Sequence, residues 1–146
     1  MQLLIDTQIF IWTVLDSDKL GPKTRQIMFD ADEIFVSAAS IWEIAIKAKI
    51  GKIEGDPAEF LEAIEASGFR ELKISGVHAA KVHQLALHHR DPFDRLLIAQ
   101  TLVESMKLLT TDTLFEQYSK AGTARNPMSC ILAESSKVKE GVSFEL

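Results

Sequence analysis

The chain has 146 residues, of which 47% are hydrophobic and 25% charged; this is enough for one domain with one sizeable core and excludes wholesale disorder. A formal net charge of −5 argues against broad non-specific binding to nucleic acid, because such binding depends on a basic surface. The single cysteine, Cys130, excludes an internal disulfide and fits a reducing cytoplasm.

The N-terminal segment predicts neither a signal peptide nor a membrane anchor. It lacks a basic region, and Asp6 interrupts its apolar run within the first few residues. No apolar stretch of the sequence approaches the roughly 18 residues that a membrane-spanning helix needs. We therefore expect a soluble, cytoplasmic protein with no membrane partner.

The first part of the chain alternates between short apolar runs and segments with helical spacing. Gln2–Ile5 predicts a short buried strand that ends at Asp6, and Gly21-Pro22 predicts the start of a helix that runs to about Asp30. The next expected elements are a strand over Ile34–Ser37 and a helix from about Ser40 to Lys49, which Gly51 ends. This alternation is typical of an α/β protein.

The second part continues the alternation up to about residue 120. Asp56 and Pro57 are an N-cap and a first helical residue, and Gly68 is a stop signal for the helix that they begin. The later expected elements are a strand over Phe69–Ile74, helical spacing over Ser75–Leu85, a connector over Leu87–Arg90, a helix from Asp91-Pro92 through Val103, a strand over Lys107–Thr110 and a short helix over Thr113–Ser119. Strands alternating with helices predict a mainly parallel central sheet covered by helices on both faces.

The segment from Ala121 to Leu146 has no clear periodicity, because glycines, Asn126-Pro127 and paired serines interrupt it. We predict a boundary near residue 120 that separates a regular domain over 1–120 from an atypical C-terminal tail over 121–146. The tail is expected to be disordered in the free protein or ordered by contacts with a partner.

Four acidic residues stand at or near the ends of apolar segments, namely Asp6, Glu43, Asp94 and Asp112. Asp6 and Asp112 directly follow two expected strands, and ligands of parallel α/β sheets bind at the carboxyl ends of the strands. Carboxylates held close together in a partly desolvated cleft repel one another and need a cation, and hard oxygen ligands favour Mg²⁺ or Mn²⁺. If the fold gathers the four side chains, they form a metal site.

Each acid also has a purely structural interpretation. Glu43 lies three residues after a serine, as in a capping box, and Asp6 and Asp112 precede threonines at positions suited to N-caps. Asp91 is a candidate N-cap, and Asp94 is a first-turn acid that interacts favourably with the helix dipole. Convergence of the four acids would distinguish a metal site from separate caps, and the residues alone leave both interpretations open.

Other chemistries find less support in the sequence. The segment up to Asp6 is similar to the opening of haloacid-dehalogenase phosphatases, but those enzymes require a second aspartate two residues later, where this chain has Gln8. The histidines lack the HExxH pattern, the single cysteine lacks a CxxC partner, and there is no glycine-rich phosphate loop. The two tryptophans, Trp12 and Trp42, are expected in the core, and a position for one of them in the wall of a substrate cleft is the less favoured alternative.

Four sequence blocks together resemble the PIN-domain ribonucleases, and within them the VapC toxins of bacterial toxin–antitoxin pairs. The blocks are LLIDT over residues 3–7 with Trp12 downstream, VSAASIWEIAIK over 36–47, HRDPFDRLLIAQ over 89–100, and LTTD over 109–112. The match runs from Leu3 to about Tyr118, and its combined order and spacing are highly specific. It implies a three-layer α/β/α PIN-like domain over 1–120 with a mainly parallel central sheet.

The resemblance also implies a catalytic site. Asp6, Glu43, Asp94 and Asp112 correspond to an acidic quartet that binds Mg²⁺ or Mn²⁺ for hydrolysis of RNA. Asp91 corresponds to an additional acid of the subfamily with the Asp-Pro-Phe-Asp block, and we take it as an auxiliary metal ligand.

Three further positions correspond to residues near that site. Thr7 and Thr110 match hydroxyl positions that are suited to holding a water beside the metal. Arg95 recurs beside the last acid of its block and is a candidate for contact with the substrate, while a surface ion pair of little energetic value is an equal alternative.

The partners implied by the resemblance are a cognate VapB-type antitoxin, an RNA substrate such as the transfer RNAs that VapC relatives often attack, and a second copy of the chain in a homodimer.

The competing interpretation is a catalytically inactive PIN domain that binds RNA or protein. A metal-dependent phosphatase is a third interpretation, which Gln8 disfavours. Relatives of this type usually end soon after a last short strand, and the different C-terminal segment here puts that closing strand in doubt.

Overall fold

A computed structural model describes residues 1–86, 91–111 and 129–132. The elements before the middle of the chain are β1 (Gln2–Ile5), α1 (Thr7–Val14), α2 (Pro22–Asp30), β2 (Glu33–Ser37), α3 (Ala38–Lys49) and α4 (Pro57–Ala66). They are followed by β3 (Arg70–Leu72), α5 (Gly76–Lys81), the short 3₁₀ helix η1 (Val82–Gln84), α6 (Pro92–Glu104), β4 (Lys107–Thr110) and β5 (Ser129–Leu132). None of the helices in these ranges is both long enough and apolar enough to cross a bilayer.

The strands form one sheet of five in the order β3-β2-β1-β4-β5, and each adjacent pair is parallel. The predicted mainly parallel sheet is therefore confirmed. β1 is central, and its register aligns Leu4 with Phe35 of β2 on one side and with Leu108 of β4 on the other. Leu4 and Leu108 are fully buried, and Phe35 is partly buried against them, which is why the aligned position is apolar in all three strands.

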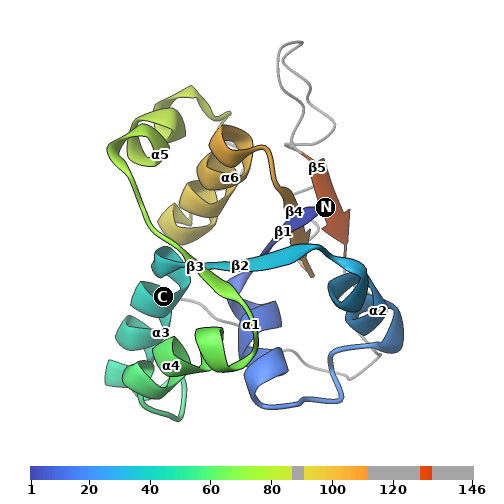
Figure 1. Cartoon of the computed structure of the whole chain (residues 1–146). Helices are drawn as coiled ribbons and strands as arrows, with labels where there is room; N and C mark the ends of the chain where they lie inside the picture. The colour runs from blue at the N-terminus through green and yellow to red at the C-terminus, as the bar shows by residue number, and fades with distance from the viewer. Residues whose placement is uncertain (87–90, 112–128, 133–146) are drawn as a thin grey trace.

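Two apolar cores separate the sheet from two helical layers, because successive side chains of a strand point to opposite faces. Leu3, Ile5 and Leu109 pack on one face with residues of α1, α2, α3 and α4. Leu4 and Leu108 pack on the other face against α6. Figure 1 shows α5 and α6 on one side of the sheet and α1, α2 and α4 on the other. The expected three-layer α/β/α arrangement is confirmed.

Local signals place several helix ends where the sequence predicts them. α4 and α6 begin at Pro57 and Pro92, each capped by the preceding aspartate. The residue after the C-cap of α4 is Gly68, which has φ +78° and so adopts the left-handed conformation that glycine tolerates best. Capping and turn chemistry depend on a few neighbouring residues, which is why the sequence reveals them.

Other elements differ from the sequence-based expectation. α3 begins at Ala38 with Ser37 as its N-cap, two residues before the expected start. The expected strand over Phe69–Ile74 contains only the three residues of β3, which is the edge strand next to β2. The helical spacing over Ser75–Leu85 forms α5 and then η1 in place of one continuous helix.

A closing strand does exist within the segment that follows Ala121. β5 pairs in parallel with β4, and Ile131 packs against the core that contains Leu109. Its four residues are too few to show a period, so tertiary pairing decides their conformation. The connector over 87–90, the expected helix over 113–119 and the remainder of the tail lie outside the described residues.

Candidate active site

The candidate site lies at the carboxyl ends of the two central strands. β1 has β2 on one side and β4 on the other, so the chain leaves β1 toward one edge of the sheet and later returns to the opposite edge. Such a change of direction opens a crevice at the carboxyl ends of the strands, where α/β proteins bind ligands. Asp6 directly follows β1, Thr110 ends β4, and the backbone N–H of Asp6 donates to the carbonyl of Leu109 at 3.0 Å.

The carboxylate of Asp6 is held on both of its oxygens. Oδ1 accepts from the backbone N–H of Ile9 at 2.8 Å, which caps α1, and Oδ2 accepts from the hydroxyl of Thr110 at 2.6 Å. Only 6% of Asp6 is exposed. The capping interpretation of Asp6 is therefore confirmed, and the same carboxylate also joins the end of β1 to the end of β4.

Burial raises the pKa of Asp6 to about 7, from an ordinary value of 3.8. The hydrogen bonds from Thr110 and from the N–H of Ile9 lower this pKa, whereas the negative charges of Asp94 and Glu43 raise it. The repulsion shows that Asp94 and Glu43 lie within electrostatic range of Asp6. Three of the four predicted acids therefore lie near enough to influence one another through their charges, and their sharing of one metal ion stays a prediction.

Glu43 reaches this site from α3. Its Oε1 lies 2.8 Å from the hydroxyl of Thr7, and its Oε2 accepts from the ammonium group of Lys47 at 2.6 Å. The proposed capping box of Ser40 and Glu43 is wrong, because α3 begins earlier and the hydroxyl of Ser37 caps it by accepting from Ala39 N. With no capping role, the Glu43 carboxylate is free to face the first turn of α1.

Two buried residues of this region were not among the predicted site residues. Lys47 is 2% exposed and forms a buried ion pair with Glu43. The hydroxyl of Ser40 lies 2.9 Å from that of Thr7, which links α3 to α1 beside the acids. The spacing of Glu43 and Lys47, four residues apart on one helix, is the sequence signal that predicts their contact.

Asp94 and Asp91 occupy the first turn of α6 in different roles. Asp91 is the N-cap, and its Oδ1 accepts from the backbone N–H groups of Phe93 at 2.9 Å and of Asp94 at 3.3 Å. Asp94 is half-buried and acts on the pKa of Asp6 through its charge. The N-cap interpretation of Asp91 is confirmed, and its auxiliary role toward a metal stays a prediction.

Arg95 contacts the backbone of the segment that follows α5. Its guanidinium donates to the backbone carbonyl oxygens of Ala86 and Val82, both at 3.1 Å. These bonds hold the segment after α5 against α6, which is a structural role. Contact of Arg95 with a substrate stays a prediction.

The donor set of the described site consists of oxygen atoms, from carboxylates and threonine hydroxyls. Such donors suit Mg²⁺ or Mn²⁺ better than softer metals. In the ranges that the structure describes, no three His, Cys, Asp or Glu side chains stand in a ready metal-binding arrangement. Asp112, the fourth predicted acid, lies outside those ranges and follows Thr110 by two residues.

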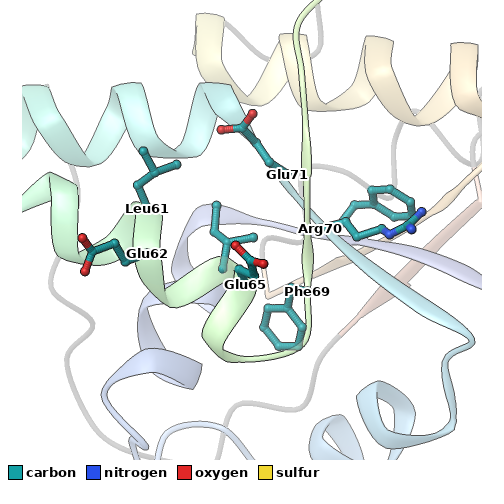
Figure 2. A pocket seen from close by; sticks show the side chains of 8 residues that line it. Leu61, Glu62, Glu65, Phe69, Arg70 and Glu71 are labelled. Atoms are coloured by element: carbon teal, nitrogen blue, oxygen red, sulfur yellow. The ribbon is translucent and has the colours of Figure 1, made fainter.

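Two surface hollows differ in their relation to these acids. The larger, about 780 Å³, lies beside β3 and α4; Figure 2 shows Phe69 and Arg70 there with the carboxylates of Glu62, Glu65 and Glu71. None of the predicted site residues lines it. The second hollow, about 490 Å³, is lined in part by Gln8 and Thr111, which are close neighbours in sequence of Asp6 and Thr110.

The comparison with family models decides the classification, because a model described as the PIN domain matches residues 3–121. The chain belongs to the PIN-domain family. The resemblance inferred from the four sequence blocks is thereby confirmed at the level of the family. No curated protein matches the sequence of this PIN domain.

Solved structures agree with this classification at the level of the fold. A chain of VapBC2 from Rickettsia felis, in a complex with a promoter DNA fragment, is 13% identical with a TM-score of 0.67, and the match covers 92% of this PIN domain and 100% of that chain. A chain of DNA-bound VapBC from Salmonella typhimurium is 14% identical with a TM-score of 0.63, covering 90% and 97%. A chain in the structure of FitAcB from Neisseria gonorrhoeae is 18% identical with a TM-score of 0.54, and the match covers 76% of this PIN domain and 88% of that chain.

Proposed function

We propose that this PIN domain is a VapC-type toxin that hydrolyses RNA phosphodiester bonds as a metal-dependent endoribonuclease. The observation that supports the proposal is the position of Asp6 between the carboxyl ends of β1 and β4 in a PIN-domain fold, within electrostatic range of Glu43 and Asp94. Separate helix caps do not require such convergence, whereas a metal site does. Asp112 completes the proposed quartet by its position after β4.

Mg²⁺ or Mn²⁺ fits the chemistry of these residues. Asp6, Glu43, Asp94 and Asp112 would hold the ion, with Asp91 as an auxiliary acid. The bound ion supplies positive charge that offsets the carboxylates and the phosphate, and it makes a water molecule more acidic. The raised pKa of Asp6 supports this assignment, because it reflects burial and negative charge that the surrounding hydrogen bonds only partly offset.

The hydroxyls of Thr7 and Thr110 position the acids in this proposal. Thr110 holds one oxygen of Asp6, and Thr7 lies against one oxygen of Glu43. Both threonines are buried, so their hydroxyls keep the carboxylates oriented without competition from bulk water. No side chain has to act as a nucleophile, since water attacks the phosphorus in line with the leaving ribose oxygen.

The proposed partners follow from the family and from its structural neighbours. Structures of VapBC and FitAcB are among the proteins with this fold, which supports an antitoxin as the partner. We propose that this antitoxin inserts a segment into the acidic crevice. We also propose RNA as the substrate, with transfer RNA as the first class to test, homodimerisation, and a cytoplasmic location. An adjacent upstream reading frame for a small protein would identify the antitoxin.

One observation favours a second candidate, an inactive PIN domain that binds RNA or protein. The two oxygens of Glu43 already contact Lys47 and Thr7 at 2.6 and 2.8 Å. A resident ammonium group neutralises part of the acidic charge without any metal. An inactive domain would use the same fold and lack cleavage.

The test is cleavage of total cellular RNA by the purified chain, with Mg²⁺ and with EDTA. We expect fragments with Mg²⁺, none with EDTA, and a loss of at least about a hundredfold in rate for Asp94→Asn, since one charge leaves the metal site. Asp56→Asn is the matched control, because it removes a charge from an exposed helix start and asparagine retains the cap. A well-folded Asp94→Asn protein that cuts RNA as fast as the parent contradicts the proposal.

Expression in cells tests the toxin role separately. The parent chain should arrest growth, co-expression of the antitoxin should restore it, and Asp94→Asn should be harmless at equal abundance. Growth arrest that persists with Asp94→Asn would favour the binding module.

A further inference from the structure

The ammonium group of Lys47 shares a carboxylate with the proposed metal site. Its Nζ donates to Oε2 of Glu43 at 2.6 Å, and both residues are buried. They stand four residues apart on α3, so one turn of the helix brings them into contact. A proposed metal ligand therefore already carries a cation of the chain itself on one of its two oxygens.

The other oxygen of Glu43 is held by neutral groups. The hydroxyl of Thr7 donates to Oε1 at 2.8 Å, and the hydroxyl of Ser40 lies 2.9 Å from that of Thr7. Hydroxyl groups orient a carboxylate but do not cancel its charge. The orientation of Glu43 is thus supported by Thr7 as well as by Lys47, whereas the opposing positive charge comes from Lys47.

We propose that Lys47 is a resident counter-ion, a cation of the chain that neutralises Glu43 and thereby lowers the affinity of the acidic site for divalent cations. Any metal ion on Glu43 must share that carboxylate with the ammonium group. Two positive charges on one buried carboxylate repel each other strongly, because little water or salt screens them. This inference rests on the proposed function and adds to it how metal occupancy is regulated.

A counter-ion affects stability and metal affinity in opposite directions. Without Lys47, the Glu43 carboxylate is a buried charge that lacks its ion-pair partner, which destabilises the protein in the absence of metal. A divalent cation then relieves more negative charge than it does in the parent and should bind more tightly. A residue that only positioned Glu43 would act differently, because its loss would weaken metal binding and stability together.

Titration with Mn²⁺ measures the affinity directly, since electron paramagnetic resonance detects the free ion. Lys47→Met should bind Mn²⁺ at least about tenfold more tightly than the parent, because one repelling charge is gone. Lys47→Gln should change the affinity in the same direction, and it keeps an amide donor for Glu43 in case Lys47→Met does not fold without metal. Lys47→Arg retains the positive charge and should bind Mn²⁺ like the parent.

Two controls tie the effect to the contact with Glu43. Lys49→Met removes the same charge from an exposed position at the end of α3, where water and salt screen it, so the affinity should stay unchanged. Asp94→Asn should weaken Mn²⁺ binding both in the parent and in Lys47→Met. Undiminished tight binding after Asp94→Asn would place the ion away from the acids and overturn the counter-ion proposal.

The outcomes separate the counter-ion from the proposed ribonuclease. If the parent cleaves RNA and neither Lys47→Met nor Lys47→Gln binds Mn²⁺ more tightly, the counter-ion is wrong and the ribonuclease stands. If these variants bind Mn²⁺ more tightly and neither they nor the parent cleave RNA, the counter-ion stands and the ribonuclease is wrong. Absence of Mn²⁺ binding in the parent and in the variants alike would overturn both.

Discussion

The ammonium group of Lys47 and the carboxylate of Glu43 form an ion pair inside the protein. Their side chains are 3% and 8% exposed, so the pair is largely desolvated. In such surroundings the loss of one partner is far more damaging than the loss of both, because it leaves an unpaired buried charge. Lys47 therefore stabilises the site before any metal binds.

We predict that Lys47→Met lowers the free energy of unfolding by about 3–5 kcal/mol in metal-free buffer. The double change Lys47→Met with Glu43→Gln should recover most of this loss, since no charge is then left unpaired. Urea denaturation measures both. Lys49→Met, on the exposed side of the same helix, is the control and should change stability little. A double variant as unstable as Lys47→Met would contradict the prediction.

Asp6 makes the stability of the metal-free protein depend on pH. Its pKa rises from 3.8 to about 7 on folding, so between these values the folded state binds more protons than the unfolded state. The free energy of unfolding must then fall as pH rises through this window and level off above it. The full effect is on the order of 4 kcal/mol at most.

Asp6→Asn removes this titration and retains a side chain that can cap α1. We predict that the difference in unfolding free energy, variant minus parent, grows from pH 5 to about pH 7 in favour of the variant, because the titration of Asp6 ends there. Urea denaturation in EDTA at several pH values measures it. Parallel pH profiles for the two proteins would show that Asp6 does not titrate in this range.

At the scale of the element, the start of α6 combines a structural cap with a proposed functional acid. Asp91 caps the helix through Oδ1, and Asp94 stands one turn further on. An asparagine caps nearly as well as an aspartate, whereas an alanine does not. The two substitutions at Asp91 therefore separate its capping role from its charge.

We predict that Asp91→Ala destabilises the protein by about 1 kcal/mol and that Asp91→Asn changes stability by only a few tenths. As an auxiliary metal ligand, Asp91 should contribute less to RNA cleavage than Asp94 does. The Asp91→Asn variant should therefore retain a higher rate of cleavage than Asp94→Asn. Thermal unfolding and the cleavage assay give the two readouts. Equal destabilisation by Asn and Ala would refute the capping account.

At the scale of the whole molecule, a metal bound only by the folded protein must stabilise it. The three acids belong to different helices: Asp6 caps α1, Glu43 lies within α3, and Asp94 lies in the first turn of α6. Unfolding therefore separates them. Mg²⁺ at about ten times its Kd should add about 1.4 kcal/mol and raise Tm by roughly 3–6 °C. Stabilisation therefore reports metal binding without reference to activity.

Differential scanning calorimetry with MgCl₂, against KCl of equal ionic strength, is the measurement for this prediction. Asp94→Asn should lose most of the increase because it removes a ligand charge. An equal rise with KCl, or an undiminished rise in Asp94→Asn, would mean that the ion binds elsewhere.

The sequence alone determined the features that depend on neighbouring residues. The apolar runs gave β1, β2 and β4, and the pairs Asp56-Pro57 and Asp91-Pro92 marked the starts of α4 and α6. Alternation of strands and helices was enough to predict a parallel sheet with two helical layers. The resemblance of four sequence blocks to a known family indicated which four acids to treat as one candidate site.

Only the tertiary structure decided which side chains meet. Thr110 and Asp6 are 104 residues apart in the sequence and form a hydrogen bond where the ends of β1 and β4 lie side by side. Thr7 of α1 likewise forms a hydrogen bond with Glu43 of α3. Strand order, set by burial of both sheet faces, brings them together, and no local pattern encodes it. The same holds for β5, whose four residues become a strand because β4 offers an edge to pair with. The expected core position is wrong for Trp42, which is 57% exposed, whereas Trp12 is half-buried and packs against the core.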